Sequence, residues 1–306
     1  MSDPYWYRAF GMLIGSELDL PEYYPAEPGQ PDVTIELGQA PLDIRLGLEA
    51  EGREFKGFVL LEDGRSFLHV ERVGDFLIED GREIVMAPLQ DVEPGFLRLY
   101  LTGSAMGMLF YQRGQFVLHG AAVQQPSGIS VVVGPSGAGK STLAAHLAQS
   151  GYFILTDDTL PLTETPGGFL GWPGARLFKL WEDTLTNLDE ASGALEMISN
   201  RYGKYYVPNR SVPPHESSAL REIIVLDIGD EISIEQLSGI DALKTVSDNM
   251  YRRELIPHLG LDAHYFRMLS RLCAETEVCR LTRPMDRAAI PETIRALEAR
   301  WQSAGS

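Results

Sequence analysis

Cysteine is scarce in this sequence: the 306 residues include two, Cys273 and Cys279. They do not form a C-x-x-C pair, and there is no second pair of cysteines to complete a zinc site. The sequence therefore argues against thiolate metal chemistry. We expect both side chains to be reduced, buried thiols, as in a cytosolic protein.

The chain also lacks a long hydrophobic run. The longest, from Leu97 to Tyr111, contains Arg98 and is shorter than the roughly 20 residues that a membrane-spanning helix needs. The first ten residues show no basic segment followed by an apolar one, so no secretory signal is evident. These absences predict a soluble cytoplasmic protein with no membrane partner.

Basic residues are few: 26 Lys and Arg stand against 43 Asp and Glu, a net charge of −17. A surface this acidic argues against nucleic acid and anionic membranes as partners. It is compatible with a basic peptide partner, although solubility explains it more simply. The hydrophobic content of 44% is ordinary, and the length suggests roughly two domains. A homo-oligomer stays open.

The most informative stretch is a glycine-rich segment from residue 134 to 141, here called the glycine loop. It matches the Walker A pattern G-x-x-x-x-G-K-[ST] at every fixed position. Its residues are Gly134, Pro135, Ser136, Gly137, Ala138, Gly139, Lys140 and Ser141. A run of strand type at 129–133 precedes it. A helical run at 142–148 follows, with Leu143 and Leu147 on one face.

Such an order of strand, loop and helix suits phosphate binding. Glycines let backbone N–H groups surround phosphate oxygens, and the helix N-terminus adds positive potential. Lys140 would reach the outer phosphates and the Ser141 hydroxyl would bind Mg²⁺. We include Thr142, the next residue, in the predicted nucleotide site. The cofactors predicted are ATP and Mg²⁺.

The chain divides by pattern into two halves. Residues 1–93 read as strands and turns, with a hairpin at 78–85 around Asp80-Gly81. Residues 94–113 suggest a buried helix, and we place the domain boundary before it. The prediction is a β-rich N-terminal domain, 1–93, and a mixed α/β (α+β) P-loop domain, 94–306.

Further elements are expected in the second half. We expect two short strands within 115–123, helices over 240–256, 262–274 and 292–301, strands over 152–156, 223–226, 232–234 and 278–281, and mostly loops over 182–214. The helix at 292–301 places Ile294, Leu297 and Trp301 on one face.

Two carboxylates stand at the end of the strand at 152–156. In nucleotide-binding sheets the carboxyl ends of strands gather at the ligand, so Asp157 and Asp158 are candidates for binding Mg²⁺ or accepting a proton. Because adjacent side chains in extended backbone point to opposite faces, we expect them to differ in role. His119 lies on the strand-like segment before the run at 129–133. It becomes a candidate site residue only in combination with these aspartates.

Together these residues resemble the catalytic core of HPr kinase/phosphorylase, a family whose fold is related to the ATP-dependent phosphoenolpyruvate carboxykinases. The spacing from the histidine to the loop lysine is 140 − 119 = 21, and from that lysine to the second aspartate 158 − 140 = 18. The resemblance covers 116–162. It implies that Asp158 is the general base toward a serine hydroxyl, that His119 tunes its charge, that Lys140 holds the β- and γ-phosphates, and that Asp157 supports the metal.

Outside the core, the chain looks more like the smaller HPr-kinase-like proteins found beside lasso-peptide biosynthesis genes. The segments that carry this likeness are 7–11, 176–181, 204–208 and 280–284. They imply a peptide substrate, plausibly the C-terminal serine of a lasso-peptide precursor.

The sequence also departs from true HPr kinases. Thr142 stands where they have glutamate, and Glu182 lies only near the distance expected for their metal-binding glutamate. For the late catalytic arginine the candidates are Lys204, Arg210 and Arg252. Arg176 and Lys179 are further candidate phosphate or substrate contacts. Ordinary surface charge is the alternative for these basic residues.

The sequence therefore favours an ATP- and Mg²⁺-dependent serine kinase acting on a peptide or protein hydroxyl. Three alternatives stay open: a small-molecule kinase or carboxykinase-like enzyme on the same core, an ATP-dependent nucleotide switch, and a non-catalytic peptide-binding scaffold. The set of His119, Lys140 and Asp158 argues against the last two, since binding alone requires no base.

Overall fold

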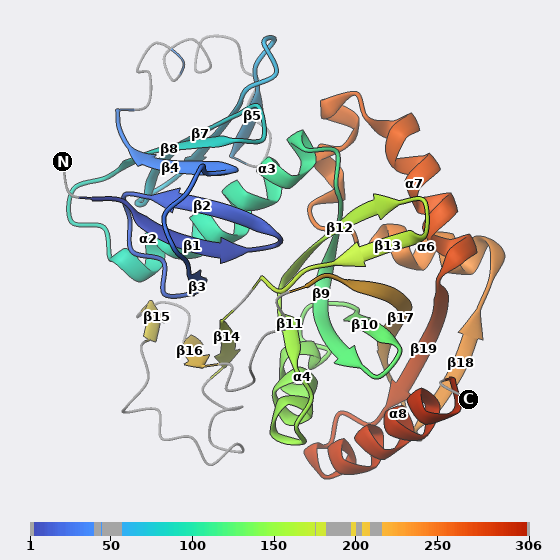
Figure 1. Cartoon of the computed structure of the whole chain (residues 1–306). Coiled ribbons are helices and arrows are strands. Elements are labelled where there is room, and N and C mark those ends of the chain that lie inside the picture. Colours follow the sequence, from blue (N-terminus) through green and yellow to red (C-terminus); the bar gives the residue numbers. More distant parts are fainter. Residues whose placement is uncertain are drawn as a thin grey trace. The chain divides into compact units, whose positions relative to one another are not determined.

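The structure is a computed structural model that describes residues 3–39, 44, 57–174, 176–181, 197–199, 204–208 and 216–304. The chain forms two compact units, Met1–Gln115 with Met197–Gly203, and Phe116–Glu196 with Lys204–Ser306 (Figure 1). Both combine helices with sheets of mixed strand direction, so the predicted α/β class is confirmed.

The first unit is built on one eight-stranded sheet. Its strands, in spatial order, are β3 (Tyr24–Pro25), β1 (Tyr5–Ala9), β2 (Met12–Ser16), β4 (Val33–Leu37), β8 (Glu83–Pro88), β7 (Gly74–Glu79), β6 (Ser66–Val70) and β5 (Phe58–Leu60). β2, β4 and β8 run parallel, and the other neighbours are antiparallel. The predicted hairpin joins β7 to β8, where Asp80 and Gly81 both take positive φ. The short β15 (Met197–Ser199) also belongs to this unit.

A buried helix belongs to the same unit. It runs as α2 (Pro94–Tyr100), the π-helical turn η1 (Leu101–Ala105) and α3 (Met106–Gln112), and it packs on β7. Inside it, Arg98 donates to Glu22 at 2.8 Å, and both side chains are buried. The predicted boundary before residue 94 assigns this helix to the second half. The compact units instead divide after Gln115, because the helix covers the N-terminal sheet.

The second unit contains another eight-stranded sheet, which places the glycine loop. Its main path is β10 (Gly128–Val133), β9 (Phe116–Gln125), β12 (Thr159–Thr165), β13 (Gly168–Gly171), β17 (Ser218–Ile228), β19 (Glu277–Arg283) and β18 (Ser233–Leu237), with β11 (Ile154–Thr156) beside β9. β10 also pairs with β17 in parallel, so β10, β17 and β19 are parallel neighbours. β14 (Leu177–Trp181) and β16 (Lys204–Pro208) form a separate antiparallel pair.

The two short strands predicted within 115–123 are one continuous strand, β9. Gly120 suggested a break, but the strand passes straight through it. A Cβ at Gly120 would lie 2.5 Å from the carbonyl oxygen of Val132 on the neighbouring strand. This glycine therefore marks a close approach between two strands and not a turn.

The helix predicted over 240–256 is also shorter than expected. α6 (Gly239–Asp248) stops because the next residues bond to β9. His119 N–H donates to the Asn249 carbonyl and Tyr251 N–H donates to the Val117 carbonyl, each at 2.9 Å. A 3₁₀ turn, η4 (Arg253–Leu255), then begins, and η5 (Pro257–Leu259) follows. Long-range strand pairing has overridden local helical pattern here.

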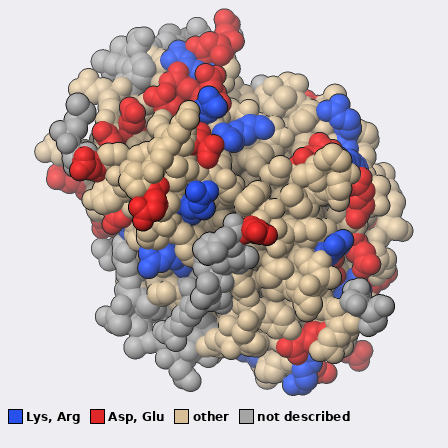
Figure 2. All heavy atoms as spheres, in the orientation of Figure 1, with Lys and Arg blue, Asp and Glu red and all other residues tan. Residues whose placement is uncertain are grey.

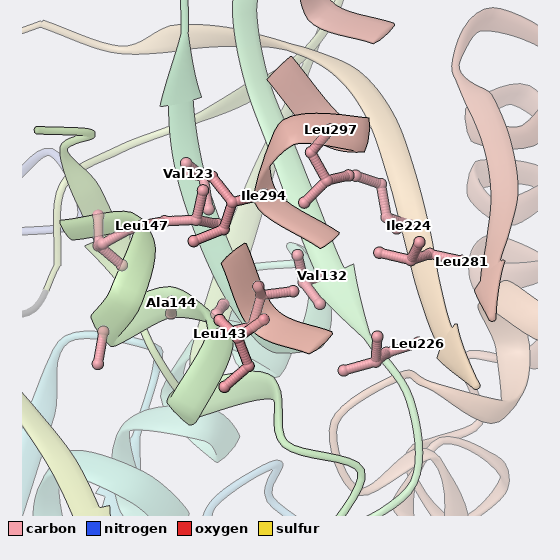
Figure 3. Packing of buried hydrophobic residues seen from close by; sticks show 14 of the residues in the cluster. Val123, Val132, Leu143, Ala144, Leu147, Ile224, Leu226, Leu281, Ile294 and Leu297 are labelled. Atoms are coloured by element: carbon pink, nitrogen blue, oxygen red, sulfur yellow. The ribbon is translucent and has the colours of Figure 1, made fainter. Parts of the chain in front are cut away.

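The remaining helices agree with the sequence pattern. They are α4 (Lys140–Gln149), α7 (Asp262–Glu275) and, after the 3₁₀ turn η6 (Arg287–Ala289), α8 (Ile290–Ala304). Figure 3 shows side chains of α4 and α8 converging on those of the strands, with Leu143, Leu147, Ile294 and Leu297 among them. Leu143, Leu147 and Leu297 are fully buried and Ile294 and Trp301 nearly so, as their helical spacing predicts.

One face of the molecule carries charges of both signs. On the face drawn in Figure 2, blue Lys and Arg side chains lie scattered among red and tan atoms. Both cysteines are unpaired thiols; Cys279 is buried, and Cys273 is partly exposed. Within the described ranges, no helix combines the length and apolar character that crossing a membrane would take.

A buried carboxylate joins four elements of the second unit. Glu222 of β17 accepts from Ser130 of β10 at 2.6 Å, from Arg300 of α8 at 2.8 Å and from the indole N–H of Trp301. Arg300 also reaches Glu277 at the start of β19, at 2.7 Å. Because its oxygens are all used by buried or half-buried donors, Glu222 fixes α8 against the sheet that carries the glycine loop.

We expect Glu222→Ala to lower the free energy of unfolding by about 3–5 kcal/mol. The substitution leaves the half-buried guanidinium of Arg300 and the buried donors of Ser130 and Trp301 without their acceptor. Urea unfolding followed by circular dichroism would measure this. The matched control is Glu277→Ala, which removes the exposed partner of the same arginine and should cost about 1 kcal/mol or less. Equal losses in the two variants would contradict the structural role of Glu222.

Candidate functional site

The glycine loop connects the end of β10 to the start of α4. Gly134, Gly137 and Gly139 all have positive φ, at 141°, 85° and 90°. A residue with a Cβ rarely adopts these values, so the sequence needs glycine at each position. A side chain at Gly137 would meet nothing within 4 Å, so only backbone conformation demands glycine there.

Lys140 begins α4, and its side chain is 7% exposed. Its ammonium group donates to the carbonyl oxygens of Gly134 and Pro135, at 2.8 and 3.2 Å. The lysine thus bridges the two ends of the glycine loop. Ser141 and Thr142 follow in the first helical turn and are partly exposed. The predicted nucleotide-site residues are therefore one contiguous segment that leads into the first turn of α4.

Strand pairing brings His119 and Asp158 together. β9 and β12 are antiparallel, with Thr159 opposite His119, so Asp158 precedes the residue that faces the histidine. Gly120 N–H also donates to the Asp158 carbonyl at 2.9 Å. The side chains meet with His119 Nδ1 at 3.2 Å from Asp158 Oδ1. The predicted pair is thus adjacent in space.

Lys179 is the third member of this group. Its ammonium lies 3.4 Å from Asp158 Oδ2, and its backbone N–H donates to Asp157 Oδ2 at 2.7 Å. The two aspartates therefore both contact Lys179, one through its side chain and one through its backbone. Asp157 is buried, whereas the Asp158 side chain is 32% exposed.

The two aspartates have opposite pKa shifts. Burial raises the pKa of Asp157, although the charge of Lys179 and the bonded N–H act the other way. Burial would also raise the pKa of Asp158. The charges of Lys179 and of the nearby His119 outweigh burial and hold that pKa well below its usual range. Asp158 therefore stays ionised at neutral pH, and the opposite shifts are consistent with distinct roles for the pair.

A cavity of about 610 Å³ opens beside His119 and the glycine loop. His119, Gly134–Ser136 and the end of β17 with Asp227 line it. The chain from Thr245 to Arg252 supplies further wall, and Arg280 of β19 also faces it. Its volume lies within the roughly 300–1,000 Å³ range of small-ligand sites.

The wall segment 249–252 is held by backbone bonds to β9 and contains a strained residue. Arg252 has φ 45° and ψ 44°, a left-handed conformation that is unfavourable for arginine. Its guanidinium carbon lies 5.8 Å from the ring centre of Tyr251. Burial raises the pKa of Tyr251, and the charge of Asp158 adds to this, so the phenol is neutral. Of the predicted basic residues, Arg252 and Lys179 are thus at the site.

Two of the other basic candidates, Arg176 and Lys204, are described and do not line the cavity. Arg176 is exposed, just before β14. The backbone of Lys204 pairs with Trp181 in the β14–β16 ladder. Arg210 and Glu182 fall outside the described residues, as do most of the loops predicted over 182–214.

Sequence reasoning assigned no role to three charged residues of this site, Asp227, Arg280 and Arg283. The last two lie in the segment 280–284, which was noted only for its likeness to HPr-kinase-like proteins. Asp227 lies near the end of β17, next to β10, and a carboxylate after an apolar run was a signal that could have found it. Arg280 Nε lies 3.7 Å from Asp227 Oδ2. Arg283 contacts the glycine loop through the Ala138 carbonyl.

The donor set fits magnesium better than zinc. In the part of the chain that the structure describes, no three His, Cys, Asp or Glu side chains gather as a metal cluster. Mg²⁺ typically takes one or two carboxylates, with phosphate oxygens and water completing its shell. The Ser141 hydroxyl and the ionised Asp158 carboxylate are donors of that kind. A Mg²⁺-nucleotide is therefore compatible with the residues present.

Comparison with known proteins adds little. No family model matches the chain, and no curated protein matches it either. Among solved structures, it is similar to the Hpr(Ser) kinase/phosphatase from Coxiella burnetii, with 10% identity and a TM-score of 0.32. That similarity covers 61% of this chain and 98% of the other. So weak a likeness carries no argument about activity, which has to be inferred from the site itself.

Proposed function

We propose that this protein is an ATP- and Mg²⁺-dependent kinase that transfers the terminal phosphate to a serine hydroxyl of a peptide. One observation carries the proposal above all: His119, which pairs with Asp158, lines the same cavity as the glycine loop. An ionised carboxylate beside a phosphate-type loop is the arrangement that phosphoryl transfer to a hydroxyl requires.

Each residue has a definite task in this proposal. The glycine loop and Lys140 bind the phosphates, and Lys140 would exchange its bonds to the loop carbonyls for phosphate oxygens. Ser141 and Asp158, supported by Asp157, would hold Mg²⁺, which supplies neutralisation of phosphate charge when bound. Asp158 also accepts a hydrogen bond from the acceptor hydroxyl.

The lowered pKa makes Asp158 a weak base. Its contribution is therefore to align the hydroxyl and to take its proton late, as the hydroxyl oxygen bonds to the γ-phosphorus and the bond between that phosphorus and the leaving ADP breaks. His119 and Lys179 keep the carboxylate ionised until then. His119 does this through Oδ1 and Lys179 through Oδ2, so each holds a different oxygen.

The peptide acceptor rests on the resemblance of the motifs and segments to HPr-kinase-like proteins beside lasso-peptide genes. That resemblance makes the C-terminal serine of a lasso-peptide precursor the first acceptor to test. We place the protein in the cytoplasm, where ATP, Mg²⁺ and such a precursor occur together.

The test is mass spectrometry of such a serine-ended peptide after incubation with the protein, ATP and Mg²⁺. We expect a phosphate-mass gain on the terminal serine. The same peptide ending in alanine is the matched control and should gain nothing. If ATP is consumed while neither peptide changes, peptide transfer is wrong and a nucleotide switch takes its place.

A small-molecule kinase is a second candidate, favoured by the cavity itself. Its volume suits a small acceptor, and Arg252 and Arg280 could pair with an anionic group on it. Adding a mixture of small hydroxy acids to the same assay distinguishes the two. ADP release that depends on one of these acids, with no peptide phosphorylation, would favour this alternative.

A further inference from the structure

Arg283 is a buried cation in contact with the glycine loop. It is the last residue of β19, and its side chain is 3% exposed. β19 lies beside β17, and β17 lies beside β10, whose end leads into the loop. The carboxyl ends of these three parallel strands therefore meet where the loop begins, which is where ligands bind in such sheets.

Among the residues that the structure describes, the guanidinium bonds only to backbone carbonyls. Nη2 donates to Ala138 in the glycine loop at 3.2 Å, and Nη1 donates to Pro284 at 2.9 Å. Nε is buried and has no hydrogen-bond partner among the described residues. The contact with the loop is close, since a Cβ at Gly139 would lie 2.5 Å from Nη2.

No described carboxylate pairs with this charge. The other buried arginine, Arg98, shows what a structural role looks like in this chain, because it is matched by the buried Glu22. Burial lowers the pKa of Arg283, and no charged neighbour offsets the effect. A buried charge without a counter-ion destabilises a fold. Its retention beside an anion-binding loop is explained if the missing counter-ion is a ligand.

We propose that Arg283 is a positioning residue for polyphosphate. Its charge attracts the bound di- or triphosphate from behind the glycine loop, and its bond to Ala138 fixes the loop conformation next to Gly139. This inference rests on the proposed nucleotide site, and it adds a second buried cation to Lys140. The two approach the loop from different elements, β19 and α4.

Calorimetric titration with ADP and with inorganic pyrophosphate tests the proposal. Arg283→Met keeps the apolar stem and removes the charge, and we expect it to weaken both ligands on the order of tenfold. Arg283→Lys keeps a charge and should stay within about threefold of the wild type. Arg267→Met removes an exposed charge on α7 and is the control for net charge, with no change expected.

Thermal unfolding without ligand separates this role from a structural one. We expect Arg283→Met to unfold at the wild-type temperature or a few degrees higher, about 2–4 °C, because an unpaired buried charge is removed. Wild-type affinity in Arg283→Met would overturn the proposal and leave the proposed function standing. Equal loss of affinity in the Met and Lys variants, with lowered unfolding temperatures, would also overturn it. If the wild type binds neither ligand, the proposed function fails as well.

Discussion

Asp158→Asn is expected to lower the rate of phosphate transfer by about 10²–10⁴, while the affinity for ADP stays within about threefold. Asparagine has nearly the same shape but cannot take a proton, and it gives Lys179 no charge to pair with. The glycine loop, where we propose that the nucleotide binds, is untouched, so the loss should appear in kcat. Single-turnover transfer to the acceptor peptide, with ADP binding measured in parallel, checks both parts.

Measuring ADP binding together with transfer distinguishes loss of the base from damage to the whole site. A variant that loses ADP binding has a damaged site and says nothing about the base. A variant with normal binding and normal transfer shows that Asp158 neither aligns the hydroxyl nor takes its proton. In that case another group would have to take the proton, and Asp227, which lines the cavity, is the next carboxylate to replace.

The pH dependence follows from the direction of the Asp158 shift. A pKa held well below its usual range keeps Asp158 ionised through the neutral and mildly acidic range. Stability that comes from its pairing with Lys179 and His119 is present above the unfolded-state pKa of about 3.9 and is lost as the pH falls below it. A decline in activity between pH 5 and 7 would therefore come from another group.

The sequence could predict the parts of the site that lie in short local motifs. The glycine loop and Asp157-Asp158 are each contiguous, and their chemistry follows from residue types in a fixed order. The pairing of His119 with Asp158 needed more, because it depends on the register of β9 with β12. The resemblance supplied that pairing where periodicity alone did not.

The rest of the site depends on contacts between distant parts of the chain. Asn249 and Tyr251 leave the predicted helix because β9 offers them backbone partners, which no local pattern reveals. Arg283 looks like an ordinary strand-end residue until β19 is placed beside β17. The break predicted at Gly120 was wrong for the same reason. Glycine is required at that position because Val132 on the neighbouring strand leaves no room for a Cβ.

Lys140→Met is expected to have the largest effect on the nucleotide itself: phosphate transfer should fall by about 10³ or more, and ADP should bind at least tenfold more weakly. Methionine keeps most of the buried stem but cannot donate to phosphate oxygens or to the Gly134 and Pro135 carbonyls. Calorimetry with ADP and single-turnover transfer are the measurements. Lys244→Ala removes a lysine that is 77% exposed on α6 and should change neither.

Comparing the Lys140 and Asp158 variants separates binding from transfer. If Lys140 holds phosphates and Asp158 serves the acceptor, Lys140→Met loses ADP affinity and transfer together, whereas Asp158→Asn loses transfer alone. The double variant should then bind ADP as weakly as Lys140→Met and no more weakly. Loss of ADP affinity in Asp158→Asn as large as that in Lys140→Met would mean that the carboxylate acts mainly through the nucleotide and its metal, and the acceptor would then need another base.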